Sequence, residues 1–230
     1  MLKKNLDIVR DNIRKACDSA GRSYDDVTLI AVSKTKPLSD IETLMQYGET
    51  EFGENKVQEL VDKYERVLSP VHWHLIGHLQ TNKVKYIVDK VSLIHSVDSV
   101  HLAKEIEKEA AKHDVVVDIL VQVNIAHEDT KFGIDEASVY DLLEEIKNYP
   151  HIRVKGLMTI APFVENAEEN RVHFRKLHQL LLDIKSKNID NIDMSILSMG
   201  MTNDYEIAIE EGATMVRVGT GIFGERNYNK

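Results

Sequence analysis

Two lysines close an early apolar stretch of the sequence and could act on a carbonyl group. The stretch AVSKTKP places Lys34 and Lys36 on either side of a threonine. If the preceding residues form a strand, alternation puts Lys34 on the same face as Ile30 and Val32. A lysine in such a setting is rarely buried without a partner or a purpose. Because burial lowers the pKa of an amine, Lys34 is a candidate nucleophile toward an aldehyde or ketone.

Lys36 lies on the same face by alternation, so strand geometry alone does not distinguish the two lysines. The following Pro37 favours an extended residue before it and suits the first turn of a helix. We therefore place Lys36 in the loop, where contact with solvent or with an anion is the expected role.

Two glycine-containing loops in the last part of the sequence could bind a phosphate. SMGMTN covers residues 198–203 and GTG covers residues 219–221, and each follows an apolar run. Backbone N–H groups and a helix N-terminus in such loops commonly hold a phosphate, although two ordinary tight turns would give the same pattern. Arg217 lies inside the apolar run MVRV, where it either forms a salt bridge in the core or contacts a ligand.

These features together suit one cofactor. A carbonyl-reactive lysine, a phosphate loop and an inward arginine fit pyridoxal 5'-phosphate (PLP), whose ring nitrogen needs an Asp or Arg partner. A sugar-phosphate aldolase with a Schiff-base lysine would share the first two features but has less need of the arginine. His72, His74 and His78 lie close together, but no carboxylate at a suitable spacing joins them, so we predict no metal site.

Eight short apolar runs, separated by amphipathic stretches of helical periodicity, position these residues. We predict strands at residues 27–33, 51–54, 73–77, 93–97, 115–124, 154–160, 193–199 and 214–220. Strands that alternate with helices pair in parallel through right-handed crossovers, and eight such units in about 200 residues favour a compact (β/α)8 barrel. An open doubly wound sheet is the alternative, but the expected glycine-rich turn is missing after the first strand.

An amphipathic helix is predicted ahead of the barrel. Leu6, Val9, Ile13 and Cys17 recur at helical spacing, and Gly21 ends the pattern. We interpret Cys17 as a buried structural thiol. No linker or repeat divides the sequence, so we predict a single α/β barrel domain over residues 1–230.

Composition excludes several classes of function. The net charge of −9 argues against a nucleic-acid or anionic-membrane surface. With only one cysteine, the chain can form neither an internal disulfide nor a site of several thiolates, which fits a reducing cytosol. No stretch approaches the roughly 20 apolar residues of a membrane span. We therefore expect a cytoplasmic protein that binds neither nucleic acid nor membrane.

Six sequence blocks resemble, in order and approximate spacing, the YggS/PROSC family of pyridoxal phosphate homeostasis proteins. They are AVSKTKP, FGENKVQE, HWHLIGHLQTNK, GLMTIAP, LSMGMTNDYEIAI and TMVRVGTGIFGER. The resemblance implies a barrel like the N-terminal domain of alanine racemase, with PLP in its mouth and Lys34 as the Schiff-base lysine. It implies that Arg217 faces the pyridine nitrogen and that Asn55 lies near the ring. The phosphate contacts implied in this way are Ser198, Gly200, Gly219 and Thr220.

The resemblance further implies a protein that holds PLP and hands it on, with PLP-dependent apo-enzymes as candidate recipients and Lys36 as a receiver or relay. We predict no catalytic residue, because an arginine that keeps its proton leaves the ring a weak electron sink. The alternative is a PLP-dependent amino-acid racemase. A racemase of this kind relies on a second, β-rich domain, and the sequence ends at Lys230 soon after the eighth strand. We therefore expect a monomeric carrier.

Overall fold

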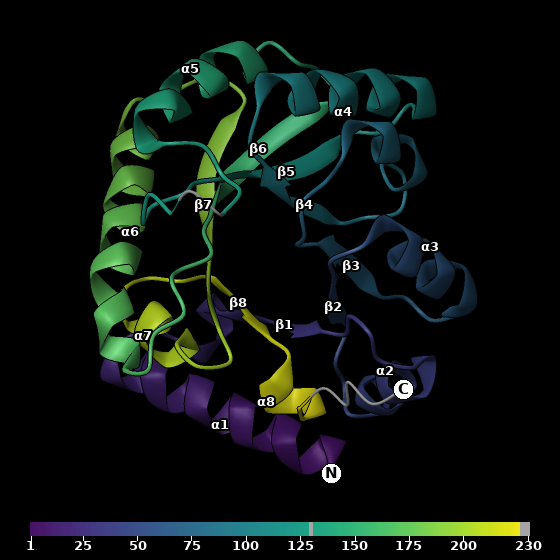
Figure 1. The fold of residues 1–230 in the computed structure, drawn as a ribbon, viewed down its shortest axis with the longest axis vertical. Helices are drawn as coiled ribbons and strands as arrows, with labels where there is room; N and C mark the ends of the chain where they lie inside the picture. The colour runs from purple at the N-terminus through teal and green to yellow at the C-terminus, as the bar shows by residue number, and fades with distance from the viewer. Residues whose placement is uncertain (129–130, 226–230) are drawn as a thin grey trace.

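Eight parallel strands form a closed barrel in which each strand pairs with the next and β8 pairs with β1. The computed structural model describes residues 1–128 and 131–225. Helices surround the strands (Figure 1). The strands are β1 (Thr28–Val32), β2 (Glu51–Glu54), β3 (His72–Leu75), β4 (Leu93–Val97), β5 (Val117–Gln122), β6 (Ile152–Met158), β7 (Ile192–Met201) and β8 (Met215–Val218). The predicted (β/α)8 barrel is confirmed.

Most crossovers between strands contain an α-helix, as the amphipathic stretches predict. The helices are α1 (Leu2–Ser19), α2 (Leu38–Gln46), α3 (Val57–Arg66), α4 (Val100–His113), α5 (Glu136–Ile146), α6 (Arg171–Ser186), α7 (Tyr205–Glu210) and α8 (Thr220–Phe223). The short 3-10 helices are η1 (Tyr24–Asp26), η2 (Thr81–Tyr86) and η3 (Ala167–Asn170). Between β3 and β4 the described connection contains only η2.

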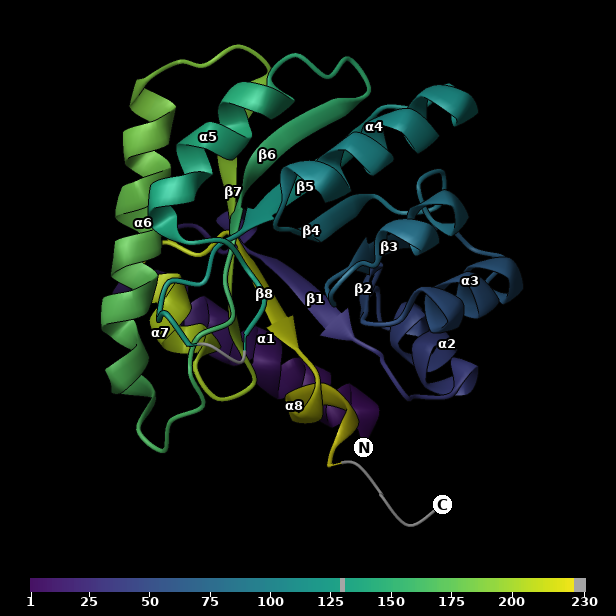
Figure 2. The same cartoon turned by 45° about the horizontal axis from the view of Figure 1, so that its top comes forward.

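The predicted N-terminal helix is present as α1, on the outer side of β1 and β8 (Figures 1 and 2). Its apolar stripe, which includes Leu6, Ile13 and Cys17, is fully buried against α2, α7 and α8. Burial of one such aliphatic side chain contributes about 1.5–3 kcal/mol. Asn5 adds a hydrogen bond to α8, in which its side-chain N–H donates to the carbonyl of Ile222 (2.9 Å). The helix therefore closes the side of the barrel where α8 is too short to do so.

The buried apolar residues fall into two groups. The larger group lies between the strands and the helices, and the smaller one contains Leu93, Leu120 and Met158 from β4, β5 and β6. His74, His95, Ser198 and Arg217 are also buried strand residues. Buried polar groups need partners, and the hydrogen bonds of these four residues form part of the site described below.

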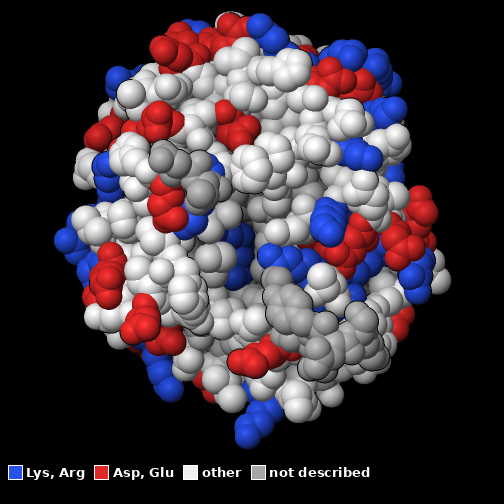
Figure 3. Space-filling view, in the orientation of Figure 1, with Lys and Arg blue, Asp and Glu red and all other residues white. Residues whose placement is uncertain are grey.

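A space-filling view shows a central hollow on one face of the barrel, with basic side-chain atoms inside it (Figure 3). In the part of the chain that the structure describes, no helix has both the length and the apolar character to cross a membrane. The same residues contain no group of His, Cys, Asp and Glu side chains that could hold a metal ion.

Candidate functional site

A cavity of about 670 Å³ opens where the carboxyl ends of the strands meet. Its volume lies within the usual range of small-molecule sites, roughly 300–1,000 Å³. Five of the seven predicted site residues line it, namely Lys34, Asn55, Arg217, Gly219 and Thr220. The barrel therefore brings together strand ends that are far apart in the sequence.

The two lysines of AVSKTKP separate because the backbone turns between them. β1 ends at Val32, and Thr35 has a φ of 65°, in the left-handed region. Lys34 lines the cavity, whereas Lys36 donates to the carbonyl of Phe223 in α8 (3.3 Å). Strand alternation could not distinguish the two lysines because the strand has ended before either of them.

A buried cluster, which we call the Lys63 cluster, holds the loop that carries Lys34. It consists of Ser33, Glu54, Glu59 and Lys63. The Lys63 ammonium donates to the carbonyl of Ser33 (2.8 Å) and to Oε1 of both glutamates (2.7 Å each). The Ser33 hydroxyl donates to Glu54 Oε1 (2.6 Å), and the backbone N–H of Thr35 donates to Glu59 Oε1 (2.6 Å). These bonds fix both sides of Lys34 and hold Thr35 in its left-handed conformation.

Glu54 is fully buried, and Lys63 is only 5 % exposed. Burial raises the pKa of Glu54, and the Lys63 ammonium and the two hydrogen bonds oppose that rise. Lys63 was not predicted from the sequence. The only signal for it is that Glu59 and Lys63 are four residues apart on a helix, a spacing that also occurs in exposed pairs.

Arg217 is buried, and its hydrogen-bond partners among the described residues are a hydroxyl and a backbone carbonyl, so the salt-bridge interpretation is not supported. Its guanidinium donates to Ser198 Oγ (2.5 Å) and to the carbonyl of Thr159 (2.7 Å). Burial lowers the pKa of Arg217 to about 10, and Asp204 opposes the shift. The side chain is therefore a fixed, charged donor at neutral pH that still lines the cavity.

Ser198 and Gly200 lie in β7 but are not among the cavity-lining residues. Ser198 is fully buried and bonded to Arg217, so it positions the arginine. Gly200 has a φ of 88°, and a Cβ atom there would lie 2.6 Å from Cβ of Ala208 and 2.9 Å from Cα of Tyr205. Its lack of a side chain allows α7 to pack closely against β7. Direct phosphate contact by Ser198 and Gly200 stays a prediction.

Replacing Gly200 with alanine is expected to destabilise the fold by about 1–3 kcal/mol, the usual cost of an overpacked and strained position. Chemical denaturation measures this change. Gly48→Ala is the matched control, because Gly48 also has a positive φ (78°) but a Cβ atom added there would meet no other atom within 4 Å. A loss in Gly200→Ala no larger than that of the control would show that packing of α7 does not require the glycine.

The loops that follow β7 and β8 are bonded to each other at one side of the cavity. Thr202 Oγ1 accepts from the backbone N–H groups of Gly219 and Gly221 (3.3 Å each). Asp204 accepts from the N–H of Met201 (2.7 Å) and from the side chain of Asn170 (2.8 Å). These contacts hold Gly219 and Thr220 at the cavity wall.

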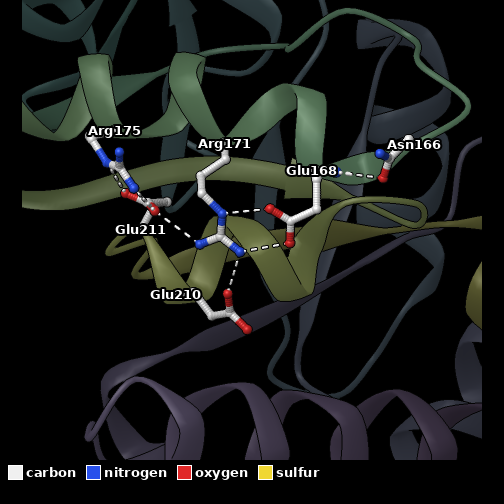
Figure 4. A network of polar contacts seen from close by, with 6 residues as sticks. All are labelled: Asn166, Glu168, Arg171, Arg175, Glu210 and Glu211. Atoms are coloured by element: carbon white, nitrogen blue, oxygen red, sulfur yellow. Dashed lines mark hydrogen bonds and ion pairs between the residues drawn. The ribbon is translucent and has the colours of Figure 1, made fainter.

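A network of arginines and glutamates supports this side from outside (Figure 4). Arg171, at the start of α6, donates to Glu168, Glu210 and Glu211, and Arg175 also donates to Glu211. These hydrogen bonds raise the pKa of Arg171 above its ordinary value. The network joins η3 and α6 to α7, and thereby fixes the walls that contain Asn170 and Asp204.

A further part of the cavity wall, on the loops after β5 and β6, was not predicted from the sequence. Glu128, Lys131 and Phe163 line the cavity, and Phe163 is 87 % exposed. Lys131 donates to Glu128 Oε1 (2.8 Å) and to the carbonyl of Ala161 (2.9 Å). The strand-end rule identifies the last residues of each strand, whereas these three lie several residues further along their loops.

Other proteins share the closed eight-stranded barrel of this chain. The model of the family described as "Alanine racemase, N-terminal domain" matches residues 5–227. An alanine racemase of Clostridium difficile 630 shares the fold, with a TM-score of 0.77 at 14% identity over 99% of this chain and 57% of that one.

Within that class, the chain belongs to the pyridoxal phosphate homeostasis protein family, also called YggS/PROSC. The protein of that name from Aquifex aeolicus (strain VF5) is 46% identical over 226 residues, which cover 98% of each chain. The one from Escherichia coli (strain K12) is 38% identical over 98% of this chain and 97% of its own. The solved structure of PipY from Synechococcus elongatus PCC7942 with PLP bound has a TM-score of 0.82 at 33% identity, covering 92% of this chain and 100% of that one. The resemblance found in the sequence blocks is confirmed.

Proposed function

We propose that the chain binds PLP in the 670 Å³ cavity, bonds it covalently through Lys34 and serves PLP homeostasis as a carrier or buffer. The observation that carries the proposal is that Lys34 and Arg217 line the same cavity as Gly219 and Thr220. These residues bring an amine, a fixed positive charge and the backbone of a tight loop to one cavity. The PLP-bound structure of PipY supports the choice of ligand.

The chemistry of the lining residues fits PLP. When bound, PLP supplies an aldehyde that reacts with amines and a ring that can withdraw electrons. Lys34 would hold the aldehyde carbon, and Asn55 would lie beside the ring. Arg217 would donate an N–H to the ring nitrogen, and the backbone at Gly219 and Thr220 would hold the phosphate. Among described lining residues, three cationic side chains outnumber two anionic ones, which favours an anionic ligand.

Two features of the cavity support a role without substantial catalysis. Burial lowers the pKa of Arg217 only to about 10, so the guanidinium keeps its proton at neutral pH; it would donate to the ring nitrogen of PLP and leave that nitrogen unprotonated. No Tyr, His or Cys is present among the cavity-lining residues that the structure describes. The second amine, Lys131, is engaged by Glu128 and by the carbonyl of Ala161. A racemase needs a second acid–base group facing the substrate, and these residues offer a poor one.

The domain organisation, the oligomeric state, the cellular location and the recipient proteins are also proposals. We infer that residues 1–230 act as one unit, as a monomer in the cytoplasm, and that PLP-dependent apo-enzymes receive the cofactor. The net charge of −9 and the single, buried Cys17 are compatible with a reducing compartment and with partners other than nucleic acid.

Two assays of the PLP-loaded protein test the carrier against the racemase. In the first, a panel of single-enantiomer amino acids is incubated with the protein and analysed by chiral chromatography, and we expect no racemisation above that of free PLP. In the second, the loaded protein is mixed with a PLP-dependent apo-enzyme, whose activity we expect to return. Racemisation well above free PLP that is lost in Lys34→Ala would instead assign an enzyme.

A further inference from the structure

A row of four side chains connects Arg217 to the opposite end of the barrel. We call Glu51, His74, His95 and Ser198 the polar row. Glu51 Oε2 lies 2.7 Å from His74 Nε2, and His74 Nδ1 lies 3.0 Å from His95 Nε2. His95 Nδ1 lies 2.9 Å from Ser198 Oγ, to which Arg217 donates. The row therefore passes through the barrel interior by way of β2, β3, β4, β7 and β8.

With one proton on each imidazole, the two ends of the polar row determine the direction of every hydrogen bond in it. A carboxylate can only accept, and a guanidinium can only donate. His74 must therefore donate from Nε2 to Glu51 and accept at Nδ1 from His95. His95 in turn accepts at Nδ1 from the Ser198 hydroxyl, whose oxygen accepts from Arg217. Each link then holds one proton, and each imidazole carries its proton on Nε2.

The environment of the row supports this assignment. His95 is fully buried, and burial, together with the neighbouring His74 and Arg217, places the pKa of His95 well below its ordinary value. Burial alone would raise the pKa of Glu51, but the hydrogen bonds with His74 and His72 bring it below its ordinary value. Glu51, the acceptor at one end of the row, is thus ionised, and Arg217, the donor at the other end, is charged.

The Glu51 end is the part of the row that solvent reaches. The Glu51 side chain is 22% exposed and its second neighbour His72 is 60% exposed, whereas His74 is only 3% exposed. Glu49, which pairs with Arg10, is the other charged group beside Glu51. At the cavity end, Asp204 is the charged group that acts on Arg217.

A second proton on His74 would reverse the row. His74 would then donate from Nδ1 to His95, and His95 would donate to Ser198 Oγ. That oxygen would accept from both His95 and Arg217, and the serine hydroxyl would lose its acceptor. A change of proton count at the far end of the barrel would therefore add a second donor to the serine oxygen that accepts from Arg217.

We propose that Glu51, His74 and His95 are positioning residues for Arg217, and that through Ser198 they fix its guanidinium in the cavity wall. The effect on bound PLP rests on the proposed function. The hydrogen-bond direction is a property of the protein alone and is tested without PLP.

The first test measures the histidine tautomers by ¹⁵N NMR in the PLP-free protein, with assignments from single histidine replacements. The expected result is an Nε2–H tautomer for both His74 and His95, with the His95 ring neutral at and above about pH 6.5, the ordinary pKa of histidine. An Nδ1–H tautomer or a charged ring at His95 in that range would overturn the proposal. Because the PLP-free wild-type protein is measured, the result does not depend on whether PLP binds.

The second test compares Glu51→Ala with His72→Ala in the PLP-loaded protein. Glu51→Ala removes the acceptor that directs the row, and we expect PLP to be retained roughly 10-fold less tightly and its absorption band to shift. Outer hydrogen-bond partners have effects of about this size at metal sites. His72→Ala leaves the row complete, and we expect a change of less than about 2-fold. Equal PLP retention and spectra in Glu51→Ala and the wild-type protein would overturn the proposal, whereas a wild-type protein that binds no PLP would instead refute the proposed function.

Discussion

Lys34→Ala is expected to abolish the borohydride-reducible bond between the protein and PLP. Lys34 is the lysine that the turn at Thr35 leaves at the cavity, whereas Lys36 is directed to the carbonyl of Phe223. Without the amine, only the contacts of the phosphate and the ring remain to hold the cofactor. The measurement is reduction of the loaded protein with borohydride, followed by mass spectrometry of the intact chain and of its peptides.

Lys36→Ala is the matched control, because it removes a lysine two residues away that is not among the lining residues. It should retain the reducible adduct, and its peptide map should show the modification at Lys34. A wild-type adduct on Lys36 or on Lys131, which does line the cavity, would contradict the assignment. An adduct that persists unchanged in Lys34→Ala would contradict it as well.

The fold could be predicted because parallel strands that are covered on both sides leave a strong local signal. All five residues of β4 are buried, and three residues of the run LIHSV are apolar. Lys34 and Arg217 could be identified because a charged side chain within or directly after a buried apolar strand is unusual. The N-terminal helix gave an equally local signal in its spacing of apolar residues.

The remaining parts of the site depend on contacts between distant segments, which a periodic pattern does not record. Ser198 belongs to a glycine-containing loop pattern, but its hydroxyl bonds with His95 and Arg217 beneath the cavity. His74 resembled a possible metal ligand in sequence, and its partners instead come from β2 and β4. Thr35 adopts its left-handed φ because Glu59 accepts from its N–H, and no residue type in KTKP predicts that turn.

Lys63→Met is expected to destabilise the protein by about 3–5 kcal/mol, the usual cost of removing one partner from a buried ion pair. The substitution keeps most of the apolar side chain but leaves Glu54 charged, fully buried and without a cation. It also releases the carbonyl of Ser33, so the loop that holds Lys34 loses its support. Denaturant unfolding measures the free energy, and Arg66→Met is the control.

Arg66 lies on the same helix and pairs with Asp62, but both side chains are largely exposed, so its loss should cost less than about 1 kcal/mol.

The pH dependence of the stability loss distinguishes an effect of charge from an effect of packing. Burial already raises the pKa of Glu54 in the folded protein, and loss of Lys63 raises it further, so the folded state binds this proton more tightly than the unfolded state. The loss of unfolding free energy in Lys63→Met is therefore largest above the pKa that Glu54 has in the folded variant. It becomes smaller as the pH falls through that pKa. Adding Glu54→Gln should recover much of the loss at neutral pH, whereas a deficit that neither acid nor Glu54→Gln reduces would attribute the role of Lys63 to packing alone.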